Sequence, residues 1–99
     1  MDAVSKGYWM VSVTIHDPDT YKRYIEENAV AFAKYGARFL ARGGRHESPE
    51  GLTGTRNAII EFESYEQALA CYNSPEYQAA LKHRLASSSA HTVIVEGVE

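Results

Sequence analysis

Four short segments of the chain, residues 8–15, 38–42, 56–62 and 92–96, are predicted to be β-strands. The first is rich in β-branched and aromatic residues, and in the first and third successive side chains alternate between two distinct faces. In the first segment, one apolar face would carry Trp9, Val11, Val13 and Ile15. The opposite, mixed face would carry Tyr8, Met10, Ser12, Thr14 and His16.

Between these segments, apolar residues recur every three or four positions, which predicts amphipathic helices. The longest helix would follow Asp17-Pro18, which supplies an N-cap and a proline at the first helical position. Gly36 would end it as a C-cap. Two shorter helices are expected over residues 65–72 and about 75–85, and three serines at 87–89 would break the second of them.

The predicted order is strand, helix, strand, strand, helix, short extra helix, strand. This is the βαββαβ order of an α+β ferredoxin-like fold, with an antiparallel sheet and helices on one face. The length suits a single domain, expected over residues 6–97. Alternation also places Leu40, Arg42, Ile59 and Glu61 on the mixed face of the sheet. That face is too apolar to remain in water, so we expect a homodimer with the two sheets packed face to face.

The composition limits which binding partners and which cellular location are expected. The net charge is −3, and phosphate binding along a polymer needs a concentrated basic face, so nucleic acid is not an expected partner. Arg38, Arg42, Arg45 and Arg56 could still form a patch large enough for one carboxylate or phosphate. The sequence has no run of 18 apolar residues and no apolar N-terminal segment, so a cytoplasmic protein without membrane contact is expected.

Cysteine and histidine spacing gives no indication of a metal or cofactor. Cys71 is the only cysteine and lies in an apolar helical stretch, which predicts a buried structural thiol. His83 and His91 lack metal-ligand spacing, and the Gly43-Gly44 pair lacks the spacing of a nucleotide-binding loop. The two glycines are expected to make a bulge or kink in an edge strand.

The run from Arg42 to Glu47 is the main candidate site, because it places four ionisable side chains around two glycines. Arg42 could hold a carboxylate or enolate at two points, or form an ion pair with Glu61 on the neighbouring strand. The two interpretations are compatible, because an ion pair with Glu61 would orient Arg42 for ligand binding. His46 is the candidate general acid or base, and its alternative is an ordinary solvated loop histidine.

Three further residues are candidates for ligand binding, each with a simpler alternative. Ser12 could donate a hydrogen bond to a ligand or only make room for one. His16 could reach a ligand from the end of the first strand or only cover the start of the helix. Tyr77 could bring its hydroxyl to a pocket mouth, although helix capping alone explains the residues that precede it.

Several short motifs agree in order and spacing with a known family over residues 6–97. They are Lys6-Gly7-Tyr8-Trp9, Asp17-Pro18, Arg42-Gly43-Gly44, Ile60-Glu61-Phe62, Ser74-Pro75-Glu76-Tyr77 and Val93-Ile94-Val95-Glu96-Gly97. The chain resembles the domain-of-unknown-function family numbered thirteen-thirty, in the dimeric α/β-barrel group of ferredoxin-like proteins. The resemblance implies this fold and a dimer. The wider group includes cofactor-free oxygenases, haem-dependent enzymes, isomerases and regulatory proteins, so kinship does not select a reaction.

The leading hypothesis is a homodimer that binds a small anionic or carbonyl-bearing molecule between sheet and helices. Arg42 would hold this ligand, Glu61 would orient Arg42, and His46 would move a proton if the protein is an enzyme. A non-catalytic dimeric structural or regulatory protein is the alternative. A third hypothesis, which draws on the seven tyrosines, is a cofactor-free, oxygenase-like enzyme that acts on an aromatic substrate.

Overall fold

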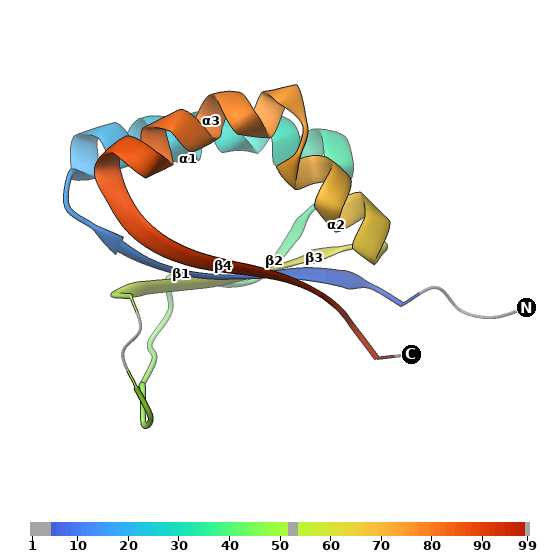
Figure 1. Cartoon of the computed structure of the whole chain (residues 1–99), viewed down its shortest axis with the longest axis horizontal. Coiled ribbons are helices and arrows are strands. Elements are labelled where there is room, and N and C mark those ends of the chain that lie inside the picture. The colour runs from blue at the N-terminus through green and yellow to red at the C-terminus, as the bar shows by residue number, and fades with distance from the viewer. Residues whose placement is uncertain (1–4, 52–53, 99) are drawn as a thin grey trace, which may run out of the picture.

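The computed structural model describes residues 5–51 and 54–98 of the chain. A four-stranded antiparallel sheet with the strand order β2-β3-β1-β4 is covered on one side by helices (Figure 1). The strands are β1 (Gly7–Ile15), β2 (Arg38–Arg42), β3 (Arg56–Phe62) and β4 (Ser88–Glu96). The helices are α1 (Pro18–Tyr35), α2 (Tyr65–Tyr72) and α3 (Pro75–Ser87). This arrangement confirms the predicted α+β ferredoxin-like fold with its extra helix.

The residues that were expected to begin and end the helices do so. The Asp17 carboxylate accepts hydrogen bonds from the backbone N–H and the hydroxyl of Thr20, at 3.3 and 2.8 Å. Ser64 and Ser74 cap α2 and α3 in the same way. Gly36 ends α1 in the left-handed conformation, with φ +69°.

The last strand begins earlier than predicted. Ser88 and Ser89 were expected to lie in a break, but they pair with Ile15 and Thr14 at the start of β4. The hydroxyls of Ser87 and Ser88 cap the end of the helix, because both donate hydrogen bonds to carbonyl oxygens in the last turn of α3. The chain can therefore pass from helix to strand without a separate loop.

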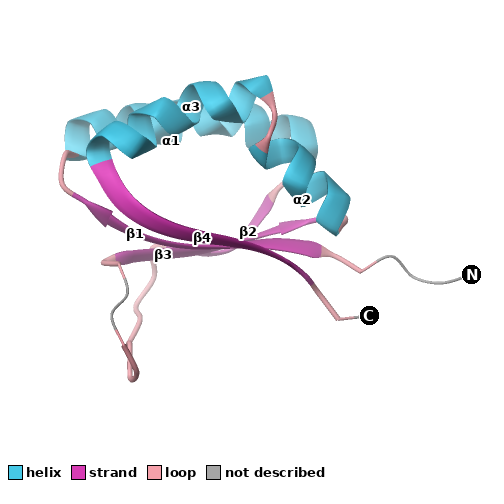
Figure 2. Ribbon diagram, viewed as in Figure 1, coloured by secondary structure: helices cyan, strands magenta, loops and turns pink. Residues whose placement is uncertain are grey.

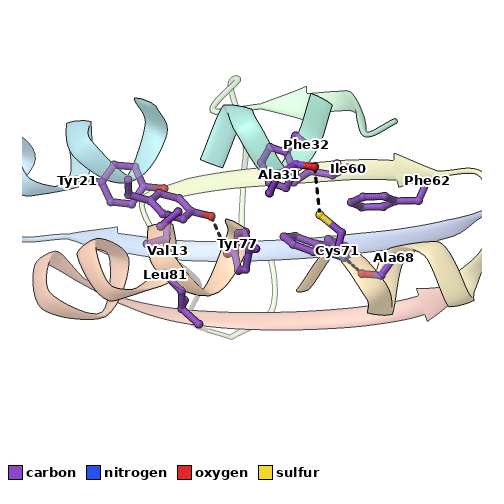
Figure 3. Packing of buried hydrophobic residues seen from close by; sticks show 13 residues of the cluster. Val13, Tyr21, Ala31, Phe32, Ile60, Phe62, Ala68, Cys71, Tyr77 and Leu81 are labelled. Atoms are coloured by element: carbon purple, nitrogen blue, oxygen red, sulfur yellow. Dashed lines mark hydrogen bonds between the residues drawn. The ribbon is translucent and has the colours of Figure 1, made fainter. Parts of the chain in front are cut away.

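The core lies between the helices and the sheet (Figure 3). Trp9 is fully buried within it. Its indole N–H donates to the carbonyl oxygen of Ala68 at 3.0 Å. The ring centroids of Phe32, Phe62, Tyr72 and Tyr77 surround it at 4.8–5.7 Å. This aromatic cluster fixes the distance between the two layers.

Cys71 is part of this core, as predicted. Its thiol is buried and faces the carbonyl oxygen of Ala31 at 3.9 Å. Burial raises the pKa of Cys71 to about 12. The residue is a structural thiol, because almost none of it is ionised near neutral pH.

The face of the sheet away from the helices has no covering layer within the described residues (Figure 2). We call it the open face; its apolar side chains are Met10, Ile59, Val93 and Val95, which are 36–55% exposed. After β2 the chain extends away from the helices, on the same side as this face (Figure 1). Within residues 5–51 and 54–98, no helix has the length and apolar character needed to cross a membrane.

Candidate functional site

A β-bulge in β2 decides where Arg42 lies. The pairing of β2 with β3 shifts between Phe39 and Ala41, so one residue is extra. After the bulge Arg42 lies opposite Ala58, a position on the helix-covered face. The expectation that Arg42 shares the open face with Glu61 is therefore wrong, because one extra residue reverses the alternation.

Glu61 has other partners, on the open face. Its carboxylate lies 3.6 Å from Nη1 of Arg38 and accepts a hydrogen bond from the Tyr8 hydroxyl at 3.0 Å. The hydrogen bond to Glu61 raises the pKa of Tyr8, which keeps the phenol protonated as the donor. Glu61 thus stabilises the open face and does not orient Arg42.

Arg42 instead lines a narrow slot between α1 and the β2–β3 edge of the sheet. We call this space the arginine slot; its polar lining consists of Tyr21, Tyr24, Asn28, Arg42 and Arg56. Aliphatic and phenyl side chains from α1 and three strands make up the rest. Its volume of about 30 Å³ is enough for a water molecule or a small anionic group.

The two arginines reach the slot from adjacent strands, Arg42 from the end of β2 and Arg56 from the start of β3. The guanidinium carbon of Arg42 lies 4.2 Å from the centroid of the Phe39 ring, a cation–π contact. The guanidinium of Arg56 packs against Gly43, where a Cβ atom would overlap with it. Gly43 has φ +70°, so the prediction that the diglycine bends the strand end holds for this residue. Neither arginine has a carboxylate within ion-pair distance among the described residues.

Asn28 adds an uncharged polar group to the slot. It is only 5% exposed, and it lines the slot from the buried side of α1. Asn28 falls in the apolar stripe of α1, between Tyr24 and Phe32. An amide in the core stripe of a helix was the signal, because a buried amide needs a hydrogen-bond partner.

Tyr77 does not lie at a pocket mouth, so that expectation is wrong. It is 1% exposed, and its hydroxyl lies 2.8 Å from the hydroxyl of Tyr24. Figure 3 shows Tyr77 inside the core, with its hydrogen bond to this neighbour drawn as a dashed line. Burial raises the pKa of Tyr77, so it remains a neutral phenol.

The other candidates lie away from the arginine slot. Ser12 lies on the open face, where its hydroxyl oxygen accepts a hydrogen bond from the backbone N–H of Gly54 at 2.6 Å. His16 is exposed beyond β1, and its backbone N–H donates to Ser87 at the turn into α1. His46 is exposed on the loop after β2, with Nδ1 3.3 Å from the carbonyl oxygen of Gly44. The structure thus brings Arg42 into a site but not the rest of the predicted set.

No group of three or more His, Cys, Asp or Glu side chains in residues 5–51 and 54–98 has the geometry to hold a metal ion. The slot offers cationic and amide donors, which fit an anion and not a cation.

Solved structures place the chain in the ferredoxin-like α+β class. The RPA0582 protein of unknown function from Rhodopseudomonas palustris is 15% identical with a TM-score of 0.77, over 96% of this chain and 84% of that one. SnoaB, a cofactor-independent oxygenase from Streptomyces nogalater, is 10% identical with a TM-score of 0.64, over 97% and 96%. A dimeric protein of unknown function and ferredoxin-like fold from Bacteroides fragilis is 18% identical with a TM-score of 0.60, over 92% and 95%.

The sequence itself matches one family over nearly its whole length. Residues 6–98 match the family described as Domain of unknown function (DUF1330), and the chain belongs to it. This confirms the resemblance seen in the motifs. No curated protein matches the chain.

Proposed function

We propose that the protein is a homodimer that binds a small anionic or carbonyl-bearing molecule, best a carboxylate, in the arginine slot. The observation that carries this proposal is the convergence of Arg42, Arg56 and the buried amide of Asn28 on one space that contains no acidic side chain. Two guanidinium groups and an amide around a space without a carboxylate favour an anion from outside.

The chemistry of the slot suits a carboxylate head group. A guanidinium can donate two parallel hydrogen bonds to a carboxylate, and the Asn28 amide can donate a third. Each charge-assisted hydrogen bond contributes about 1.5–3 kcal/mol. The volume of about 30 Å³ admits only the head group, so the body of the ligand would extend past Arg42 to the exposed edge of the sheet.

Binding by Arg42 is tested with a matched pair of variants on one strand. We expect Arg42→Ala to weaken the binding of butyrate at least about tenfold, followed by NMR chemical-shift titration, because it removes a charge-assisted contact. Arg38→Ala is the control, since Arg38 lies on the open face beside Glu61 and should leave the affinity unchanged. Equal affinity in Arg42→Ala and the parent protein would exclude this assignment.

The dimer is proposed to form through the open face. Met10, Ile59, Val93 and Val95 expose apolar surface there, and the first three line a groove of about 320 Å³ together with Ser12. A second open face would cover this surface, and the B. fragilis protein of the same fold is described as dimeric.

Sedimentation velocity tests the interface. Met10→Asp should convert the dimer to a monomer, because it places a charge in the middle of the apolar surface. Val30→Asp is the control, since Val30 is 61% exposed on α1, away from the sheet. A Met10→Asp protein that sediments as the parent does would show that the open face is not the interface.

A cofactor-free, oxygenase-like activity on an aromatic substrate is a second candidate. The observation that favours it is the aromatic lining of the slot, to which Tyr21, Phe32 and Phe39 contribute rings. Oxygen uptake with a quinol-type substrate tests it. Anion binding without oxygen uptake would indicate a non-catalytic binding protein with a structural or regulatory role.

A further inference from the structure

The hydroxyl of Tyr21 is a polar group of the arginine slot that the proposed function leaves without a role. Tyr21 lies near the start of α1, lines the slot and is only 6% exposed. A phenol hydroxyl carries one proton to donate and lone pairs that accept. A buried hydroxyl needs partners for both, so the groups around Tyr21 decide what its proton can bind.

The other phenol of the slot directs its hydroxyl into the core. Tyr24 lies one helical turn after Tyr21, and the two ring centroids are 5.3 Å apart. The Tyr24 hydroxyl lies 2.8 Å from that of Tyr77, which is 1% exposed and is not part of the slot lining. Two hydroxyl oxygens at this distance share a hydrogen bond. Tyr24 therefore has a partner within the protein, on the side away from a ligand.

Tyr21 has a cationic neighbour instead. Burial raises the pKa of Tyr21, and the hydrogen-bonding and charge interactions of its hydroxyl with the Arg56 guanidinium oppose this rise. Both residues line the slot, so this contact lies at the proposed ligand site. A guanidinium has five N–H donors and no acceptor, so the Tyr21 oxygen can only accept from it. The proton of the phenol is left for a different partner.

The size of the slot brings a bound head group to this hydroxyl. Its volume of about 30 Å³ holds one carboxylate, whose oxygens must then lie against the polar lining. A carboxylate has about four lone-pair positions, so it can accept from Arg42 and Arg56 and from a further donor. A hydroxyl that accepts one hydrogen bond becomes a stronger donor in the next one, because linked hydrogen bonds polarise each other.

We propose that Tyr21 is a ligand-binding residue of the arginine slot, whose hydroxyl accepts from Arg56 and donates to the carboxylate held by Arg42 and Arg56. This inference rests on the proposed anion binding and adds a residue and a direction to it. The hydrogen bonds run from Arg56 through Tyr21 to the ligand, and the direction is fixed because the guanidinium can only donate. The head group must therefore present an acceptor to Tyr21, as a carboxylate does with either oxygen.

The two phenols of the slot provide a matched pair of variants, one helical turn apart. Tyr21→Phe removes only the hydroxyl, and we expect it to weaken the binding of butyrate about tenfold in an NMR titration, because a hydrogen bond to a charged group is lost. Tyr24→Phe is the control. It removes the hydroxyl that faces Tyr77 and should leave the affinity for butyrate within about twofold of the parent protein. Both variants keep the ring and so the packing of α1.

Tyrosine labelled with ¹³C at Cζ gives a spectroscopic readout that a structural role would not move. The Cζ atom carries the hydroxyl, so its resonance reports on the hydrogen bonds of that group. Butyrate should shift the Cζ resonance of Tyr21 in the parent protein and leave that of Tyr24 in place. At the same concentration of butyrate, Arg42→Ala should show a smaller shift at Tyr21, because it holds less ligand. A Tyr21 resonance that stays fixed while butyrate binds would overturn the inference.

The outcomes separate this inference from the proposed function. If butyrate does not bind the parent protein, the proposed function fails and the role of Tyr21 fails with it. If Arg42→Ala loses affinity and Tyr21→Phe does not, anion binding stands and the role of Tyr21 is overturned. Equal losses in Tyr21→Phe and Tyr24→Phe would also overturn it, since both hydroxyls would then act only through the shape of the slot.

Discussion

Gly43 offers a direct test of the arginine slot, because it controls the position of Arg56 without touching a ligand. A Cβ at this position would overlap with the terminal nitrogen Nη1 of Arg56, and the residue has φ +70°. In Gly43→Ala the strained backbone should lower the free energy of unfolding by about 1–2 kcal/mol. Arg56 ends in a flexible side chain, so it should move aside at little further cost in stability. That movement takes its guanidinium away from the slot.

The loss of one charge-assisted hydrogen bond is worth about 1.5 kcal/mol, so Gly43→Ala should weaken carboxylate binding about tenfold. Two other glycines separate the two effects. Gly36→Ala has the same backbone strain, with φ +69° and no atom within 4 Å of the added Cβ, so it should lose stability but keep its affinity. Gly44→Ala has neither problem and should change neither quantity.

The assays are urea unfolding for stability and NMR titration with butyrate for affinity. The reasoning is refuted if Gly43→Ala binds as tightly as Gly36→Ala, because Arg56 would then contribute nothing to the site. It is also refuted if Gly43→Ala is as stable as Gly44→Ala, because the left-handed backbone at Gly43 would then carry no cost.

Three further results are expected from the core and the helix caps. At pH 8 iodoacetamide should modify Cys71 at least about a thousand times more slowly in the folded protein than in urea, since its pKa of about 12 leaves little thiolate. Hydrogen bonds from Thr20 hold the pKa of Asp17 below its usual value. The parent protein should therefore be more stable than Asp17→Asn above about pH 4, and this difference in the free energy of unfolding should vanish as the pH falls through the lowered pKa of Asp17. Urea unfolding of both proteins at pH 7 and pH 2.5 would show it. Trp9→Phe should cost about 2 kcal/mol in urea unfolding, because it leaves a cavity and removes the donor to Ala68.

The elements of the fold follow from local rules that the sequence displays directly. Asp17 and Ser64 are capping residues followed by helical periodicity, and Gly36 is a C-cap that needs a left-handed conformation. Such signals act within one turn of the chain, so they survive without knowledge of the tertiary structure. The early start of β4 depends on serine hydroxyls that donate hydrogen bonds back to α3. No local sequence pattern indicates these hydrogen bonds, so the start of the strand was not predicted.

The residues that form the site were harder to predict from the sequence, because the register of strand pairing decides which face each of them occupies. Alternation assigned Arg42 to the open face, and a single extra residue between Phe39 and Ala41 moved it to the other face. A bulge has no firm sequence signature, so a strand pattern alone cannot reveal it. Asn28 carried a readable signal, as a polar residue in a core stripe.

The bulge gives the edge strand β2 two functions within five residues. Arg38 and Arg42 are four positions apart, so in a regular strand both would lie on the same face. The extra residue separates them: Arg38 meets Glu61 on the open face, whereas Arg42 reaches the arginine slot under the helices. The proposed dimer surface and the proposed ligand site therefore share one short strand. A change in the pairing of β2 with β3 would move both arginines together, so occupancy of the slot and strength of the dimer should be linked through this strand.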